Sequence, residues 1–150
     1  MIKKFLFTLI ILLLFSGCIY RGPKDSILNY IQTNCNKNIE ECLIDFNSII
    51  TFEWDKLFIK GLGLNDLEIV DILGEYYDEF CLGCGQFIFY KDNEIVHVED
   101  YYIFSFSEDK WDLNVDLPEE QYLMLKKEES TFSIRKVENR DAYVLVPTSK

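Results

Sequence analysis

The stretch QFIFYKDNEIVHV, residues 86–98, places two runs of aromatic and β-branched residues on either side of Asp92 and Asn93. Such runs favour β-strands, because branched and aromatic side chains pack well on a pleated surface. Aspartate and asparagine tolerate the positive φ angles that a two-residue hairpin turn requires. The stretch therefore predicts two antiparallel strands joined by a tight turn.

Two helices are predicted before the hairpin. Pro23 suits the first turn of a helix, and apolar residues recur at helical spacing to about Thr33. Asn65 can cap a second helix over 66–73, and Gly74 can end it. The apolar face expected for the second helix consists of Leu67, Ile69, Val70 and Leu73.

Short strands are predicted on both sides of the hairpin. They are expected at 42–46, 52–59, 122–127, 131–137 and 142–147, with YYIFSF (101–106) as a further candidate and the acidic stretch 107–120 as a connection. Two helices followed by mostly sequential strands predict an α+β fold with a mostly antiparallel sheet of about 5–7 strands.

The first 17 residues have the layout of an export signal. Two lysines precede an apolar run over residues 5–15, which only Thr8 interrupts, and small residues follow it. The run is about half of the roughly 20 residues that a helix needs to cross a bilayer, so cleavage is expected. The chain is divided into a signal peptide (1–17), a lipidated tether (18–24) and a single α+β domain (25–150).

The segment FSGC, residues 15–18, resembles the lipobox of bacterial lipoproteins. The resemblance implies that Cys18 receives a diacylglycerol and becomes the new N-terminus, although Phe15 departs from the usual leucine. The alternative is an ordinary secretory signal with a chance cysteine. Two or three acyl chains give a stable membrane tether. The expected location is the cell membrane, or the outer membrane where a second membrane exists, because Ile19 is not the aspartate of the usual retention signal.

The mature chain is strongly acidic. Without Lys3 and Lys4 the 15 basic side chains become 13, and against 26 acidic side chains the net charge is −13. Such a surface repels nucleic acid and favours cationic partners or simple solubility.

The segment FEWDKLFI, residues 52–59, together with the capped helix and the hairpin, resembles a group of small uncharacterised bacterial lipoproteins. The resemblance covers roughly residues 45–100 and departs from the group's pattern after Ile59. It implies no activity. Trp54 is interpreted as a core residue of a strand, and the pair Asp55 and Lys56 as a surface or hairpin contact.

The four cysteines of the mature domain are Cys35, Cys42, Cys81 and Cys84. In an exported protein they are expected to form disulfides, and three connectivities exist. Local pairing of Cys35 with Cys42 is worth about 2.5 kcal/mol, whereas a bond to the 81/84 region is worth about 4 kcal/mol, so the long-range pairing is preferred where geometry permits. A redox centre at Cys81 and Cys84 is the sharper alternative, but no helix follows to stabilise a thiolate. A zinc site of all four cysteines is disfavoured by the loose Cys35–Cys42 spacing.

Two stretches match the beginning of a known ligand-binding motif, a dinucleotide loop and an EF-hand loop, but lack residues that the motif requires. GLGLND (61–66) carries Asp66 where a dinucleotide loop needs its third glycine. The stretch 112–123 starts like an EF-hand loop, but Leu117 and Leu123 replace the glycine and the bidentate glutamate.

The remaining ionisable residues are interpreted as structural or surface residues. His97, the single histidine, lies on a predicted strand without a nucleophile context, so a structural or surface role is expected. The acidic pairs at 99–100, 108–109 and 119–120 are interpreted as solvated faces, because a chain this rich in carboxylates produces such pairs by composition.

These observations predict a lipid-anchored cell-envelope protein that acts through binding or as a structural module, without a catalytic site, metal or cofactor. The expected partner is an envelope or secreted protein with a basic face, and an immunity-type protein that neutralises a toxin is one version of this role. The competing hypothesis is an envelope thiol-disulfide oxidoreductase that uses Cys81 and Cys84.

Overall fold

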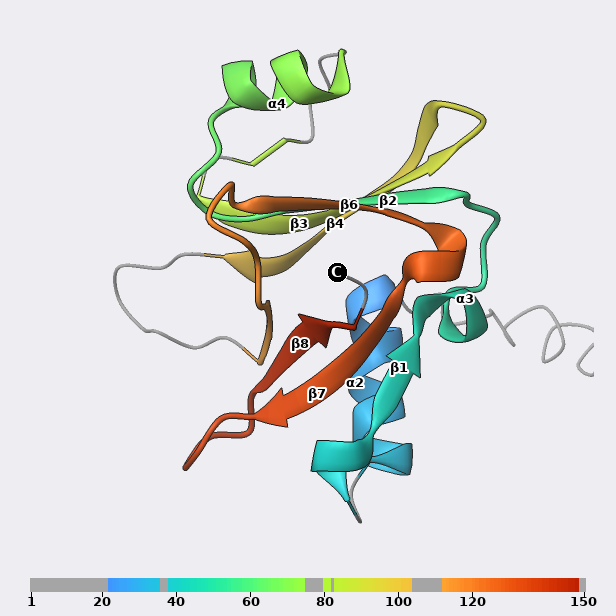
Figure 1. The fold of residues 1–150 in the computed structure, drawn as a ribbon, viewed down its shortest axis with the longest axis vertical. Helices are drawn as coiled ribbons and strands as arrows, with labels where there is room; N and C mark the ends of the chain where they lie inside the picture. The colour runs from blue at the N-terminus through green and yellow to red at the C-terminus, as the bar shows by residue number, and fades with distance from the viewer. Residues whose placement is uncertain (1–21, 36–37, 75–79, 82, 104–111, 149–150) are drawn as a thin grey trace, which may run out of the picture.

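The structure is a computed structural model, and it confirms the α+β class with two mostly antiparallel sheets where one was expected (Figure 1). Among the described residues, no helix is both long and apolar enough to cross a membrane. The structure describes residues 22–35, 38–74, 80–81, 83–103 and 112–148.

Sheet B has the strand order β4-β3-β2-β6 and is antiparallel throughout. The predicted hairpin is confirmed at its centre, because Asp92 and Asn93 have φ angles of 53° and 67°. β4 also includes the start of the predicted strand 101–106, whose last residues lie outside the described part. The strands are β2 (Lys56–Lys60), β3 (Cys84–Lys91), β4 (Glu94–Ile103) and β6 (Tyr122–Lys126).

Sheet A has the order β1-β7-β8-β5. β7 and β8 form an antiparallel hairpin, whereas β5 and β8 are parallel. β5 is a three-residue strand inside the stretch that was predicted to be a connection. Strands β6 and β7 follow each other at hairpin spacing but lie in different sheets, separated by the 3₁₀ turn η2 (Lys127–Glu129). The strands are β1 (Leu43–Asp45), β7 (Thr131–Lys136), β8 (Tyr143–Pro147) and β5 (Leu113–Val115).

Two predicted strands are shorter than expected. The strand at 42–46 ends at Asp45, whose side chain accepts the N–H of Asn47 at 2.9 Å and so begins the short helix α3 (Phe46–Ile49). The 3₁₀ turn η1 (Ile39–Glu41) precedes it. The strand predicted at 52–59 begins only at Lys56, so Trp54 lies in the preceding loop.

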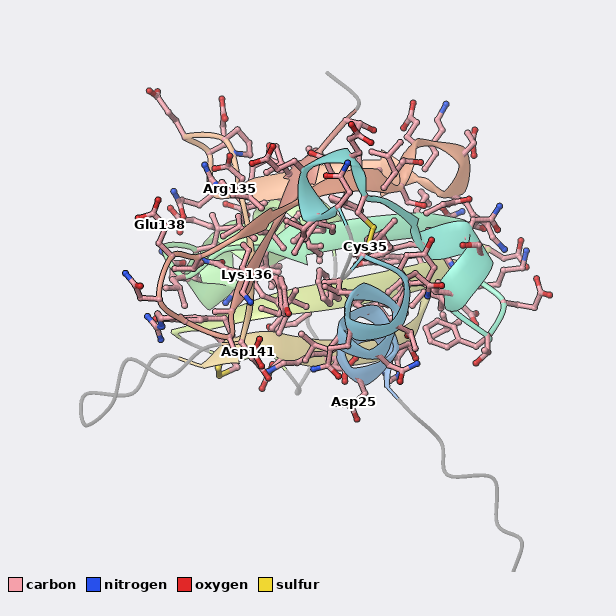
Figure 2. The ribbon with its side chains drawn as sticks, turned by 90° about the horizontal axis from the view of Figure 1, so that it is seen from below. Asp25, Cys35, Arg135, Lys136, Glu138 and Asp141 are labelled. Carbon is pink, nitrogen blue, oxygen red and sulfur yellow. A yellow bond between two sulfur atoms is a disulfide. The ribbon has the colours of Figure 1, made fainter. Side chains whose placement is uncertain are left out.

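The main core lies between the two sheets and helix α2 (Pro23–Asn34). Helix α2 confirms the first predicted helix. Ile27 and Ile31 of α2 pack with Phe87 of sheet B and Phe132 of sheet A. Figure 2 shows α2 from below with Cys35, the residue that follows the helix, pointing toward the sheets.

Helix α4 (Asp66–Leu73) covers the opposite face of sheet B (Figure 1). The prediction of its ends is confirmed, since Asn65 forms a capping box with Glu68 and Gly74 is left-handed with a φ of 78°. The predicted apolar face is partly wrong, because Leu67 is 78% exposed. The cluster under α4, here called the α4 cluster, consists of Phe58, Leu64, Ile69, Ile88 and Tyr90, with partly buried neighbours that include Ile72, Leu73 and Val98.

Candidate functional site

Three polar side chains, here called the polar ladder, cross sheet B on the face that α4 covers. Lys60 on β2 lies opposite Gln86 on β3, and Gln86 lies opposite Asp100 on β4. Each of them stands two positions along its strand from a residue of the α4 cluster or its neighbours, so all three share that face. Lys60 and Gln86 are 0% and 1% exposed.

The Cys81–Cys84 disulfide lies at the end of the polar ladder. Lys60 Nζ donates hydrogen bonds to the carbonyl oxygens of Cys81 and Cys84 at 2.7 and 2.9 Å. Gln86 Oε1 accepts the backbone N–H of Cys81 at 3.2 Å, and Gln86 Nε2 donates to Asp100 Oδ1 at 2.7 Å. The two sulfur atoms and a carboxylate oxygen of Asp100 all lie within 4.8 Å of one another.

The burial of Lys60 is the unusual feature of this site. Moving an ammonium group from water into the protein interior costs on the order of several kcal/mol, even after the protein relaxes. The two carbonyl acceptors offset part of this cost. A disulfide that closes so short a loop contributes only about 2 kcal/mol in the chain-entropy model. The staple alone therefore gives no reason to bury a lysine beside it.

The two cysteines of this disulfide differ in exposure. Cys84 is 2% exposed, whereas Cys81 is half-buried. β3 begins at Cys84, so the pair is followed by a strand, as the sequence predicts. A nucleophile from solvent can therefore approach Cys81, while Cys84 is shielded by the protein.

The second disulfide joins Cys35 and Cys42, seven residues apart. The preference for a long-range bond to the 81/84 region is therefore wrong, because both pairs form locally. Cys35 belongs to the main core and Cys84 to the face under α4, so sheet B separates them. The same separation contradicts a zinc site of all four cysteines. Cys18, the predicted lipidation residue, lies outside the described residues.

The residues of the FEWDKLFI motif hold the β3–β4 hairpin. Asp55 Oδ2 accepts the N–H of Asp92 at 2.8 Å, and Lys56 Nζ donates to Asn93 Oδ1 at 2.6 Å. Trp54 is 1% exposed and packs edge-on against a phenylalanine of β3. Trp54 is a core residue as predicted, although it lies in the loop before β2 and not in a strand. The interpretation of Asp55 and Lys56 as a hairpin contact is confirmed.

Glu99 and His97 lie near the start of α2. Glu99 Oε2 accepts the backbone N–H of Lys24 at 2.8 Å, and His97 Nε2 lies 4.0 Å from the same oxygen. His97 also packs against Phe52, with ring centroids 5.1 Å apart. Burial, the largest effect, raises the pKa of Glu99 above its ordinary value. The structural role expected for His97 is confirmed.

The interpretation of the acidic pairs as solvated faces holds for Glu119 and Glu120, which are exposed. It is wrong for Glu99 and Asp100, which are half-buried and hydrogen-bonded. The pair at 108–109 lies outside the described residues.

The failed EF-hand pattern is dispersed in the structure. Asp112 pairs with Lys24 at 2.8 Å, and Asp116 pairs with Arg135 at 3.8 Å. These carboxylates therefore do not converge on one position. This agrees with the prediction that the EF-hand pattern fails.

A cavity of about 350 Å³ lies between α4 and the sheet. Its walls combine apolar side chains of both elements with the polar ends of Lys56 and Asn93, which hydrogen-bond each other. It is separate from the polar ladder.

Sequence reasoning identified Cys81 and Cys84 but missed Lys60, Gln86 and Asp100. One signal was present for Lys60, because a charge at the end of the apolar strand KLFIK shares a face with Phe58. The pairing that joins Lys60, Gln86 and Asp100 spans three strands and has no local signature.

No protein-family model matches the chain, and no curated protein or solved structure matches it either. Fold alone does not define function, so the chemistry of this chain's own residues has to carry the functional argument.

Proposed function

We propose that this chain is a lipid-anchored protein of the cell envelope whose folded domain binds another protein without catalysis. The observation that carries the proposal is the agreement between two distant parts of the chain. The N-terminus has the layout of an export signal that ends in FSGC, and the cysteines of the described domain are paired as disulfides. Disulfides persist in oxidising compartments outside the cytoplasm.

The surface charge supports a partner with a basic face. Several of the basic side chains already pair with carboxylates, including Lys136 with Asp141 at 4.0 Å and Arg135 with Asp116. Figure 2 labels Arg135, Lys136 and Asp141. Lys60 is buried and adds nothing to the outer surface. The excess carboxylates therefore face solvent, where they attract a basic protein and repel nucleic acid. A protein that neutralises a secreted toxin is one function of this kind.

The test uses the full chain with a C-terminal tag, beside a Cys18→Ala variant as the matched control. We expect the wild-type chain in the membrane fraction with an intact mass that includes acyl chains, and the variant without them. Both should capture the same basic protein in stoichiometric amount at low salt, with weaker capture at high salt. An unmodified Cys18 would contradict the anchor. Failure to capture any defined protein at either salt concentration would contradict the binding role.

A further inference from the structure

The Cys81–Cys84 disulfide combines one cysteine that is partly exposed to solvent with one that is buried. Exchange proceeds by in-line attack of a thiolate on one sulfur, and the other sulfur leaves. Cys81 is half-buried and within reach of solvent, whereas Cys84 is 2% exposed. An incoming thiolate therefore meets Cys81 Sγ, and Cys84 is the leaving sulfur.

A leaving thiolate is stabilised by a positive group nearby, and Lys60 is a cation that contacts the backbone of both cysteines. Many reactive CxxC pairs obtain this stabilisation from a helix N-terminus, but here β3 begins at Cys84. Lys60 Nζ instead hydrogen-bonds the carbonyl oxygens of both cysteines, at 2.7 and 2.9 Å, from a fully buried position. A positive group beside a cysteine lowers the cost of the thiolate, and low dielectric strengthens the effect.

A proton acceptor lies on the same face. An Asp100 carboxylate oxygen is within 4.8 Å of both sulfurs. Gln86 holds this carboxylate by its Nε2 at 2.7 Å and holds the backbone of Cys81 by its Oε1 at 3.2 Å. Asp100 can therefore exchange a proton with a cysteine through one water.

We propose that Cys81–Cys84 is an exchangeable disulfide that reacts with dithiols of exported proteins, with Lys60 as the positive partner of the Cys84 thiolate, Asp100 as the proton acceptor and Gln86 as the positioning residue. This reaction is a stoichiometric exchange without turnover, so it goes beyond the proposed binding function without making the domain a catalyst, and it does not depend on the lipid anchor.

The reaction balances without a further reactant. A partner thiolate attacks Cys81 Sγ, the Cys81–Cys84 bond breaks, and its electron pair goes to Cys84 beside Lys60. A second partner thiolate then attacks the partner sulfur of the mixed disulfide and releases Cys81. The partner loses two electrons and two protons and gains a disulfide, while Cys81 and Cys84 become a dithiol. The reverse reaction reduces a partner disulfide.

The experiment equilibrates the full chain with glutathione buffers of graded ratio and then alkylates and maps the thiols. Cys35–Cys42 is an internal control, because no lysine contact like that of Lys60 accompanies it among the described residues. We expect Cys81–Cys84 to be reduced in the folded protein at ratios that leave Cys35–Cys42 oxidised. Resistance of Cys81–Cys84 until the protein is denatured would overturn the proposal.

The role of Lys60 is tested by the thiolate absorbance of reduced protein as a function of pH. Lys60→Met should shift the thiolate titration to higher pH and slow exchange with a two-cysteine model peptide at neutral pH by about tenfold or more. Lys60→Arg should restore part of the rate. Lys56→Met is the matched control, since Lys56 lies on the same strand and face but contacts Asn93, and it should leave both readouts unchanged.

A Lys60 variant that does not fold leaves the proposal testable in the Cys81→Ser protein, where only Cys84 of the pair, the leaving sulfur beside Lys60, titrates. An ordinary cysteine titration there, or identical titrations for the wild-type chain and Lys60→Met, would overturn the role of Lys60.

Discussion

At Gly85 the backbone of β3 passes directly under the ring of Tyr101. A Cβ atom at this position would lie 2.5 Å from the ring of Tyr101, which is too close for any side chain. Tyr101 in turn donates its hydroxyl to the carbonyl oxygen of Lys60 at 3.0 Å, and burial raises the pKa of this hydroxyl. The glycine therefore allows a buried tyrosine to reach the strand that carries Lys60.

We expect Gly85→Ala to lower the free energy of unfolding by about 1–3 kcal/mol, because the methyl group displaces the Tyr101 ring in a packed core. Urea unfolding measures the change. Gly63→Ala is the control, since a Cβ there would lie 3.3 Å from the flexible side chain of Gln121. Equal stability of Gly85→Ala and the wild-type chain would contradict the close approach.

Residues that act through local geometry could be predicted from the sequence. Asn65, Gly74 and the turn at 92–93 follow rules that involve only their neighbours in the chain, and the structure confirms them. Gly85 and Lys60 depend on strands distant in the sequence, and no local rule identifies their roles.

At the scale of elements, the start of α2 is held by a strand. Gly22 is the N-cap residue and has no side chain to accept a helix N–H, so Glu99 of β4 accepts that of Lys24 instead. A Cβ on Gly22 would lie 2.2 Å from Glu99 Oε1, so the glycine makes room for the carboxylate. The contact joins α2 to sheet B and replaces the cap that the sequence lacks locally.

Glu99 should make stability fall as pH rises. Burial raises the pKa of Glu99 in the folded state above the ordinary value of 4.5. At pH values between 4.5 and the raised pKa, the folded state therefore binds more protons than the unfolded state. Glu99→Gln keeps an oxygen acceptor but does not titrate. We expect its stability relative to the wild-type chain to increase through this window, by less than about 1 kcal/mol, and then to level off.

Urea unfolding at a series of pH values measures this difference, with exposed Glu94→Gln on the same strand as the control. A relative loss of stability for Glu99→Gln with rising pH would show that the charge stabilises α2 through its helix dipole.

Most helices and strands could be predicted because their periodicity is local, but their pairing could not. β5 has only three residues, too few for a periodic signal, and β6 and β7 look like a hairpin although they belong to different sheets. The partner of β6 is β2, more than sixty residues earlier in the chain. Pairing of this kind is set by which apolar faces can be buried together.

At the scale of the whole molecule, no disulfide among the described residues joins sheet A to sheet B. The bonds span sequence separations of 7 and 3, so each constrains one segment. The sheets are held together by the main core, to which β2 and β3 contribute from one side and β7 and β8 from the other. Burial of apolar surface, and not covalent linkage, should therefore decide whether the domain stays folded.

Reduction of both disulfides should leave the domain folded. In the chain-entropy model the two short loops together contribute about 4 kcal/mol, so we expect a lower midpoint of urea unfolding with a single transition and unchanged near-ultraviolet circular dichroism before it. A Cys35→Ser/Cys42→Ser variant, measured with and without reductant, separates the two contributions. Loss of the near-ultraviolet signal on reduction alone, or a second transition, would mean that the core cannot hold the two sheets by itself. A fold that survives reduction is also the condition under which Cys81 and Cys84 can exchange electrons with a partner.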